Sequence, residues 1–183
     1  IEVVGCYWDG IVNVKKSKVL EASLLTYLMK KTIYSSKNVI YVTEEFLQNR
    51  YPTKGSNIAC SNVTLHSLNQ QDLNNRIDKI KEKREKLVVG TCATLDVLYK
   101  GQQDVIKALA KLKQLGYEVN YQLVGGGDSS YLMNLAKEYG VEDQIEILGS
   151  LKHENVFKWL ENIDIYIHPS KQEGLSRAII EAM

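Results

Sequence analysis

Cysteine, proline and glycine, the residues that form disulfides or interrupt helices and strands, are scarce in this chain of 183 residues. It has 12 glycines, 2 prolines and 3 cysteines, whereas 44% of its residues are hydrophobic and 25% are charged. This balance is typical of a globular protein and excludes a disordered one. The cysteines, Cys6, Cys60 and Cys92, form no C-x-x-C pair, which disfavours a disulfide framework and a zinc site and favours a reducing compartment.

Long apolar runs and processing signals are missing too. No run approaches the roughly 20 apolar residues that cross a bilayer, so no membrane span is expected. Residues 1–10 lack the basic start and apolar core of a signal peptide, and we interpret the sequence as an excised piece of a longer chain. The histidines, His66, His153 and His168, are scattered without a helical zinc spacing, so no metal centre is expected.

The small net charge of +1 hides an asymmetry. Residues 1–86 carry 14 basic and 9 acidic residues, and residues 87–183 carry 9 basic and 13 acidic residues. The charged run 79–86 reads as a solvated helix face. The other basic group could face anionic lipid; it consists of Lys15, Lys16, Lys18, Lys30 and Lys31.

Apolar periodicity divides the first third of the chain into short elements. We expect helices at 18–31 and 44–49 and strands at 38–43 and 58–60. A polar stretch follows at 61–71, and 72–86 reads as a charged helix. The change in composition predicts a boundary within 61–69, between one domain at 1–65 and a second at 66–183.

The remainder alternates regularly between strands and helices. We expect strands at 87–90, 121–124, 145–148 and 163–167, and helices at 103–115, 131–139, 155–161 and 175–183. In the helix at 103–115, Val105, Ile106, Leu109 and Leu112 should face inward. The alternation predicts an α/β fold, a Rossmann-like parallel sheet with helices on both faces. Ligands bind such sheets beyond the carboxyl ends of the strands, which directs attention to the loops 91–101, 125–129, 149–153 and 168–176.

The last of these loops pairs two glutamates across seven residues, Glu173 and Glu181. Gly174 lacks a side chain where a ligand would approach the backbone, and the amides of Leu175 and Ser176 would open a helix whose positive end suits phosphate. A carboxylate can accept two hydrogen bonds from a vicinal diol. The alternative is purely structural, with Glu173 complementing a helix dipole and Glu181 exposed on the helix.

Several ordered motifs together resemble glycosyltransferase family 4, the retaining group with two facing Rossmann-like domains (the GT-B type). They are K-G-Q-Q-D-V-I-K-A-L, Y-Q-L-V-G-G-G, I-E-I-L-G-S-L-K-H-E-N-V-F-K-W-L and P-S-K-Q-E-G-L-S-R-A-I-I-E-A-M, all within 87–183. Upstream, V-V-G-C-Y-W-D-G and V-I-Y-V-T-E-E-F-L-Q-N-R-Y-P look like the end of the family's N-terminal, acceptor-side domain. The resemblance makes 66–183 the nucleotide-sugar-binding domain, truncated at its C-terminus.

The resemblance also implies roles for single residues. Glu173 would contact the donor sugar, Glu181 the ribose, and Lys100 the diphosphate. The backbone at Gly174, Leu175 and Ser176 would meet sugar hydroxyls and phosphate. The nucleobase would be bordered by Ser150, Leu151 and His153. In this reading Glu173 and Lys100 serve catalysis and the other residues bind the donor.

The implied activity is a hexosyltransferase of bacterial surface polysaccharide synthesis. It would use a nucleotide diphosphate sugar and a saccharide or lipid-linked saccharide acceptor, with no metal or other cofactor and no nucleic acid. The resemblance places it in the cytoplasm, with peripheral contact to the inner face of the plasma membrane through the missing N-terminal half.

Two departures from the family pattern limit this reading. Residues 90–99 lack the arginine that family members carry before the K-G pair, and Arg177 either replaces it or points to solvent. The family also continues beyond Met183, so the isolated chain is expected to be inactive. A non-catalytic nucleotide-binding or interaction module stays open as an alternative. A dinucleotide oxidoreductase and a P-loop protein are disfavoured, because neither glycine motif is present.

Overall fold

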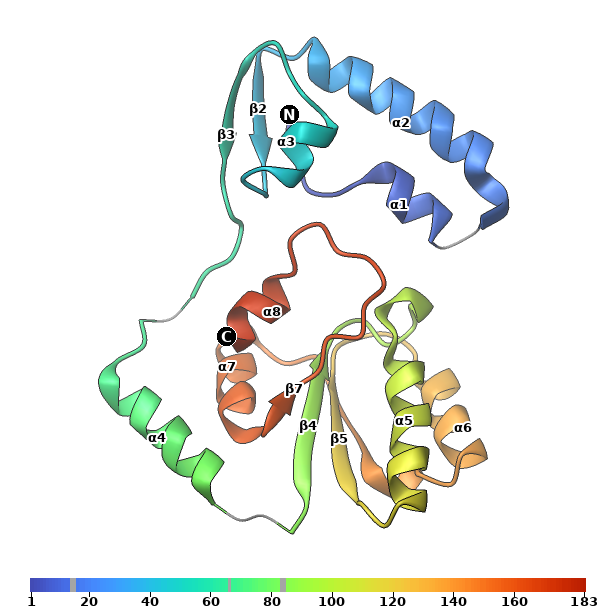
Figure 1. The fold of residues 1–183 in the computed structure, drawn as a ribbon, viewed down its shortest axis with the longest axis vertical. Helices are drawn as coiled ribbons and strands as arrows, with labels where there is room; N and C mark the ends of the chain where they lie inside the picture. The colour runs from blue at the N-terminus through green and yellow to red at the C-terminus, as the bar shows by residue number, and fades with distance from the viewer. Residues whose placement is uncertain (14–15, 66, 83–84) are drawn as a thin grey trace. The chain divides into compact units, whose positions relative to one another are not determined.

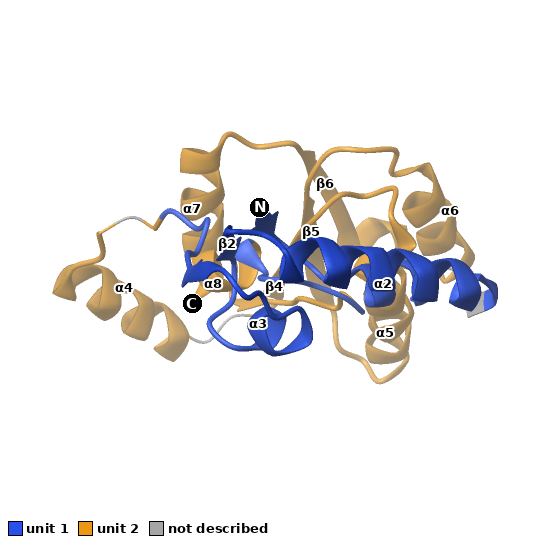
Figure 2. Ribbon diagram, turned by 90° about the horizontal axis from the view of Figure 1, so that it is seen from above, with its two compact units in different colours: residues 1–64, 171–177 blue, residues 65–170, 178–183 orange. Residues whose placement is uncertain are grey.

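A computed structural model describes residues 1–13, 16–65, 67–82 and 85–183 (Figure 1). The chain forms two compact units (Figure 2). The first comprises residues 1–64 and 171–177, and the second comprises residues 65–170 and 178–183. Within the described ranges, no helix combines the length and the apolar character needed to cross a bilayer.

The first unit is a small α/β layer with a parallel sheet in the order β1-β2-β3. Its strands are β1 at Glu2–Val3, β2 at Asn38–Tyr41 and β3 at Ser56–Ala59, and its helices include α1 at Tyr7–Val12, α2 at Val19–Tyr34 and α3 at Phe46–Arg50. Strands and helices share one apolar core, which contains Val3, Cys6, Ile33, Val39, Tyr41, Val42, Leu47 and Tyr51.

Helix α2 carries apolar residues on every side, but only part of them is covered. Ala22 and Ile33 are buried against the unit, whereas Leu20, Leu24 and Tyr27 are 86%, 60% and 63% exposed. A helix that is hydrophobic all round is normally covered on all sides. The exposed side of α2 is therefore a feature that the packing of the first unit does not explain.

The second unit contains a parallel four-stranded sheet in the order β6-β5-β4-β7. The strands are β4 at Leu87–Cys92, β5 at Val119–Val124, β6 at Ile145–Gly149 and β7 at Ile165–Tyr166. They alternate along the chain with α5 at Gln102–Gln114, α6 at Ser130–Glu138 and α7 at His153–Asn162, and α8 follows at Arg177–Ala182. The predicted Rossmann-like α/β architecture is confirmed.

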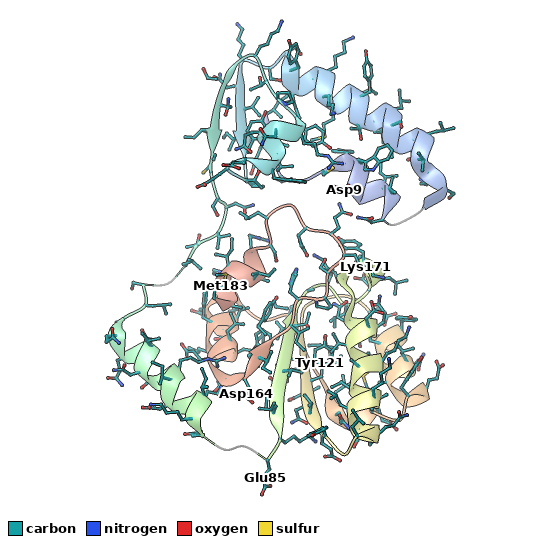
Figure 3. All side chains as sticks on the ribbon, viewed as in Figure 1. Asp9, Glu85, Tyr121, Asp164, Lys171 and Met183 are labelled. Carbon is teal, nitrogen blue, oxygen red and sulfur yellow. The ribbon has the colours of Figure 1, made fainter. Side chains whose placement is uncertain are left out.

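Helices cover both faces of this sheet, as the alternation predicted (Figure 1). On one face, α5 and α6 pack against Tyr121 and Leu123, and Figure 3 labels Tyr121 within this layer. The inward residues expected on α5 are confirmed: Val105, Ile106 and Leu109 are buried, and Leu112 packs against the same core. On the other face, α7 places Trp159 against β4 and β5, where its Nε1 donates a 2.9 Å hydrogen bond to Oε1 of Gln122.

Helix α4 (Gln70–Lys81) contacts the rest of the second unit through its basic side chains. Arg76 donates hydrogen bonds of 2.7 and 2.8 Å to the carbonyls of Ile163 and Asp164, and Lys79 donates one of 2.6 Å to the carbonyl of Glu161. These carbonyls lie at or just beyond the C-terminal end of α7, where the helix leaves backbone acceptors without partners. Arg76 and Lys79 of this predicted helix therefore bind backbone carbonyls and are not simply solvated.

Several element boundaries differ from the sequence-based expectations. Helix α4 begins two residues earlier than the expected 72, β3 lies at Ser56–Ala59 instead of 58–60, and β7 is shorter than the expected 163–167. Helix α1 was not expected at all, because six residues that include Gly10 give no helical period. Four of the residues considered in the sequence analysis lie outside the described ones: Lys15, His66, Lys83 and Arg84.

Candidate functional site

The carboxyl ends of three strands meet at one edge of the second unit. The loops that follow β4, β5 and β6 are tied to one another by backbone hydrogen bonds of 2.9 Å: Ala93 to Val124, Leu95 to Gly126, and Gly125 to Gly149. This is the edge at which a parallel sheet binds ligands. The sequence directed attention to these same loops.

Lys100 lies at this edge, at the end of a short 3-10 turn, Leu98–Lys100. Its backbone amide donates to the carbonyl of Val97 at 3.0 Å, and its Nζ lies 5.3 Å from the centre of the Tyr99 ring. Gly101 follows with a φ of 80°, a backbone conformation that favours glycine. The K-G pair therefore turns the chain from the loop after β4 into α5, and it fixes a half-buried lysine at the turn.

The three residues expected beside a nucleobase follow β6. Ser150 is exposed and sits close to Gly126, where an added Cβ would lie 2.8 Å from the Ser150 Oγ. Leu151 packs instead against the apolar layer that holds Val124 and Trp159. His153 is the first residue of α7. The structure thus places Ser150 and His153 at the surface and gives Leu151 a packing role.

Two of the predicted donor-binding residues touch each other. Nε2 of His153 lies 3.1 Å from Oε1 of Glu181, and the side chains are 53% and 10% exposed. The interpretation of Glu181 as an exposed helical residue is therefore wrong. The pKa of the Cys92 thiol is raised, first by burial and then by the negative charge of Glu181. Glu181 consequently lies near the carboxyl end of β4, since Cys92 is the last residue of that strand.

Cys92 was not singled out as a site residue from the sequence, and neither was Phe157. The His153 ring stands edge-on to the Phe157 ring, with centroids 5.0 Å apart. Their spacing of four residues on a helix was the available signal, because residues four apart share a face.

The loop 171–177, which carries the first glutamate, belongs to the first unit. Gly174 lies against the backbone carbonyl of Val4, so any Cβ at this position would collide with it. Leu175 packs against the apolar core of the first unit. Asn13 Nδ2 donates to Oε1 of Gln172 at 3.4 Å. The loop is thus built from packing that sequence periodicity does not show.

The expected start of the last helix is wrong. Helix α8 begins at Arg177, so Leu175 and Ser176 precede it and do not supply its first-turn amides. The cause is that Gly174 and Leu175 pack against the first unit, which holds the backbone in a loop up to Ser176. The E-x7-E pattern therefore divides between the units, with Glu173 in the first and Glu181 in the second.

The second unit thus gathers five of the nine predicted site residues: Lys100, Ser150, Leu151, His153 and Glu181. The other four lie on the loop of the first unit: Glu173, Gly174, Leu175 and Ser176. Chemically, the second unit presents a cation and a largely covered carboxylate near the end of β4. The lysine can bind an anionic group, and the carboxylate can accept hydrogen bonds from neighbouring hydroxyls.

A family model described as "Glycosyl transferases group 1" matches residues 74–183. Among curated proteins, the chain is 32% identical to Protein CapJ of Staphylococcus aureus over 189 aligned positions, which cover 100% of this chain and 46% of CapJ. It is 31% identical to the putative colanic acid biosynthesis glycosyltransferase WcaL of Escherichia coli over 91 positions, 46% of this chain and 22% of WcaL. The chain thus spans less than half the length of these relatives.

Solved structures share the fold. Sucrose-phosphate synthase from Thermosynechococcus elongatus matches with a TM-score of 0.74 and 17% identity, over 99% of this chain and 46% of the synthase. The pneumococcal O-GlcNAc transferase GtfA, solved in complex with UDP and GlcNAc, matches with a TM-score of 0.61 and 18% identity, over 85% of this chain and 30% of GtfA.

Proposed function

The chain belongs to the glycosyltransferase group 1 family, and we propose that its protein transfers a sugar from a nucleotide diphosphate sugar to an acceptor hydroxyl with retention of the anomeric configuration. The observation that carries the proposal is the pairing of a family match over 74–183 with a held carboxylate, Glu181, and a turn-fixed lysine, Lys100, at the ligand edge of the sheet. The complex of GtfA with UDP and GlcNAc supports a nucleotide-linked donor.

In this proposal Lys100 stabilises the negative charge that develops on the leaving diphosphate. Electrostatic stabilisation of a leaving group is commonly the largest single contribution to such catalysis. Glu181 accepts hydrogen bonds from the ribose hydroxyls. Glu173 positions the donor sugar, with the backbone of 174–176 beside it, as the family resemblance implies. No side chain is assigned as a covalent nucleophile, so Glu173 acts through donor geometry.

The acceptor is proposed to be a saccharide or lipid-linked saccharide of a bacterial surface polysaccharide. The likeness to WcaL, named for colanic acid biosynthesis, supports this assignment. Cytoplasmic donors and membrane-linked acceptors would meet at the inner face of the plasma membrane.

The family resemblance assigned the membrane contact to the missing N-terminal half, and we propose that helix α2 contributes to it. Its exposed leucines and Tyr27 form an apolar side, and Lys30 and Lys31 are exposed at its C-terminal end. A helix with leucine and tyrosine on one side and lysines beside them suits an anionic lipid surface. Vesicle flotation should show binding to phosphatidylglycerol vesicles and little to neutral phosphatidylcholine. The double variant Leu24→Glu, Tyr27→Glu should lose it, and the control Leu115→Glu, which changes an exposed leucine of the second unit, should not.

Product analysis tests the proposed reaction. We expect transfer from one member of a panel of UDP, GDP and ADP sugars, an anomeric signal that matches the donor by NMR, and no effect of EDTA. Glu173→Ala should reduce turnover far more than it reduces the unfolding temperature, because this residue lies in a loop. The 183-residue chain alone should bind donor weakly and transfer no sugar. Nucleotide binding by the longer protein without transfer to any acceptor would favour the non-catalytic module.

A further inference from the structure

We propose that His153 is a positioning residue for Glu181: it orients the carboxylate that receives the ribose hydroxyls, and it does not contact the nucleobase. The inference rests on the proposed function, in which Glu181 binds the ribose. It replaces the role that the family resemblance implied for His153. It also makes recognition of the ribose depend on a residue outside the E-x7-E pattern.

The first observation is the contact between the two side chains. Nε2 of His153 and Oε1 of Glu181 are 3.1 Å apart. A carboxylate oxygen accepts, so the ring nitrogen is the donor. The two residues come from different helices, α7 and α8, and are 28 positions apart in the chain. The hydrogen bond therefore lets His153 on α7 fix the side chain of Glu181 on α8.

The second observation is the environment of the carboxylate. The Glu181 side chain is only 10% exposed and lies close enough to the Cys92 thiol to raise its pKa. Covering a carboxylate is costly unless hydrogen bonds replace its lost water. His153 supplies such a bond to one oxygen. This bond holds the carboxylate in one orientation, and a fixed acceptor binds a diol with less loss of conformational freedom than a rotating one.

The third observation is what holds the imidazole. His153 begins α7, and its ring stands edge-on to Phe157 one turn later, with an interplanar angle of 77°. This contact limits rotation of the ring and aims Nε2 at Glu181. A hydrogen bond from Nε2 to a base would require the contact with Glu181 to break. The geometry therefore commits Nε2 to the carboxylate and not to the base.

Binding calorimetry on matched variants of the longer protein tests the proposal. The probe is the nucleoside diphosphate of UDP, GDP and ADP that binds most tightly, together with its 2′,3′-dideoxy analogue. The variants are Glu181→Gln, His153→Ala, His153→Gln and the double variant His153→Ala, Glu181→Gln. Glu154→Ala is the control, because it changes the neighbouring, exposed residue of the same helical turn. Thermal unfolding of each variant shows that it is folded.

We expect His153→Ala to weaken binding of the ribonucleotide about three- to tenfold, the worth of one hydrogen bond, and to leave the dideoxy analogue unchanged. His153→Gln should restore most of the loss, because its amide can donate. The double variant should bind no more weakly than Glu181→Gln alone, and Glu154→Ala should have no effect. An equal loss for both ligands, or a loss that persists in the Glu181→Gln background, would overturn the proposal and place His153 against the base.

Failure of the proposed function gives a different pattern. If Glu181→Gln changes neither ligand, the ribose assignment of Glu181 fails and this inference fails with it. If Glu181→Gln weakens only the ribonucleotide while His153→Ala changes nothing, the ribose assignment stands and only the role of His153 is refuted.

Discussion

Replacing Lys100 by alanine tests whether the turn before α5 binds a diphosphate. The substitution removes one cation at the ligand edge of the sheet and leaves Gly101 to form the turn. A hydrogen bond to a charged group is worth about 1.5–3 kcal/mol. Lys100 is only half-buried, so water screens part of the interaction and the lower end applies. Each 1.4 kcal/mol is tenfold in affinity, so we expect about a tenfold loss.

Calorimetry with a nucleoside, its monophosphate and its diphosphate separates charge from other effects. Lys100→Ala should weaken the diphosphate about tenfold and leave the nucleoside unchanged, since phosphate charge is the proposed partner. The loss should shrink at high salt. Lys111→Ala is the matched control, because Lys111 is an exposed lysine in the last turn of α5, the helix that follows Lys100 and Gly101. Equal losses for nucleoside and diphosphate, or the same loss in Lys111→Ala, would place Lys100 outside the diphosphate site.

Two further predictions concern the face of the sheet that α7 covers. Gly90→Ala should lower the free energy of unfolding by about 1–3 kcal/mol, because an added Cβ would meet the Trp159 ring and Ile163. Urea unfolding should be measured for Gly90→Ala, Trp159→Phe and the double variant. Gly90→Ala should lower the free energy of unfolding less when residue 159 is phenylalanine than when it is tryptophan; additive effects would refute this. The raised pKa of Cys92 leaves little thiolate at pH 8. Alkylation of Cys92 by iodoacetamide should therefore accelerate at higher pH. Glu181→Gln should lower the pKa of Cys92 and speed the reaction at pH 8. An unchanged rate would show that the charge of Glu181 does not act on the Cys92 thiol.

The fold of the second unit could be predicted from the sequence because its signals are local. On α5, apolar residues spaced three and four apart place Ile106 and Leu109 on one face, and the structure buries both. Short apolar runs such as 121–124 alternate with these helices, and that order alone dictates a parallel sheet covered on both sides. The residues at which helices and strands end could be predicted less accurately. The carbonyls of Ile163 and Asp164 accept hydrogen bonds from Arg76, a partner 87 and 88 residues away that no local pattern reveals.

The site was predicted unevenly for the same reason. The position of Lys100 follows from the K-G pair, since glycine permits the turn that the structure shows. The contact between His153 and Glu181 depends on how α7 and α8 pack, and nothing in either segment shows it. The covered state of Glu181 was likewise missed, because a glutamate near the end of a sequence reads as exposed.

The division of the E-x7-E pattern between two units has a mechanistic consequence. Glu181 is held by His153 beside the end of β4, so its position depends on the second unit. Glu173 precedes Gly174 and Leu175, whose packing against Val4 and the apolar core of the first unit fixes that loop. Glu173 is thus carried on a loop of the first unit, whereas Glu181 lies on a helix of the second unit. A substitution that loosens the packing of Leu175 is therefore expected to act on the loop that carries Glu173 and to leave the hydrogen bond between His153 and Glu181 in place.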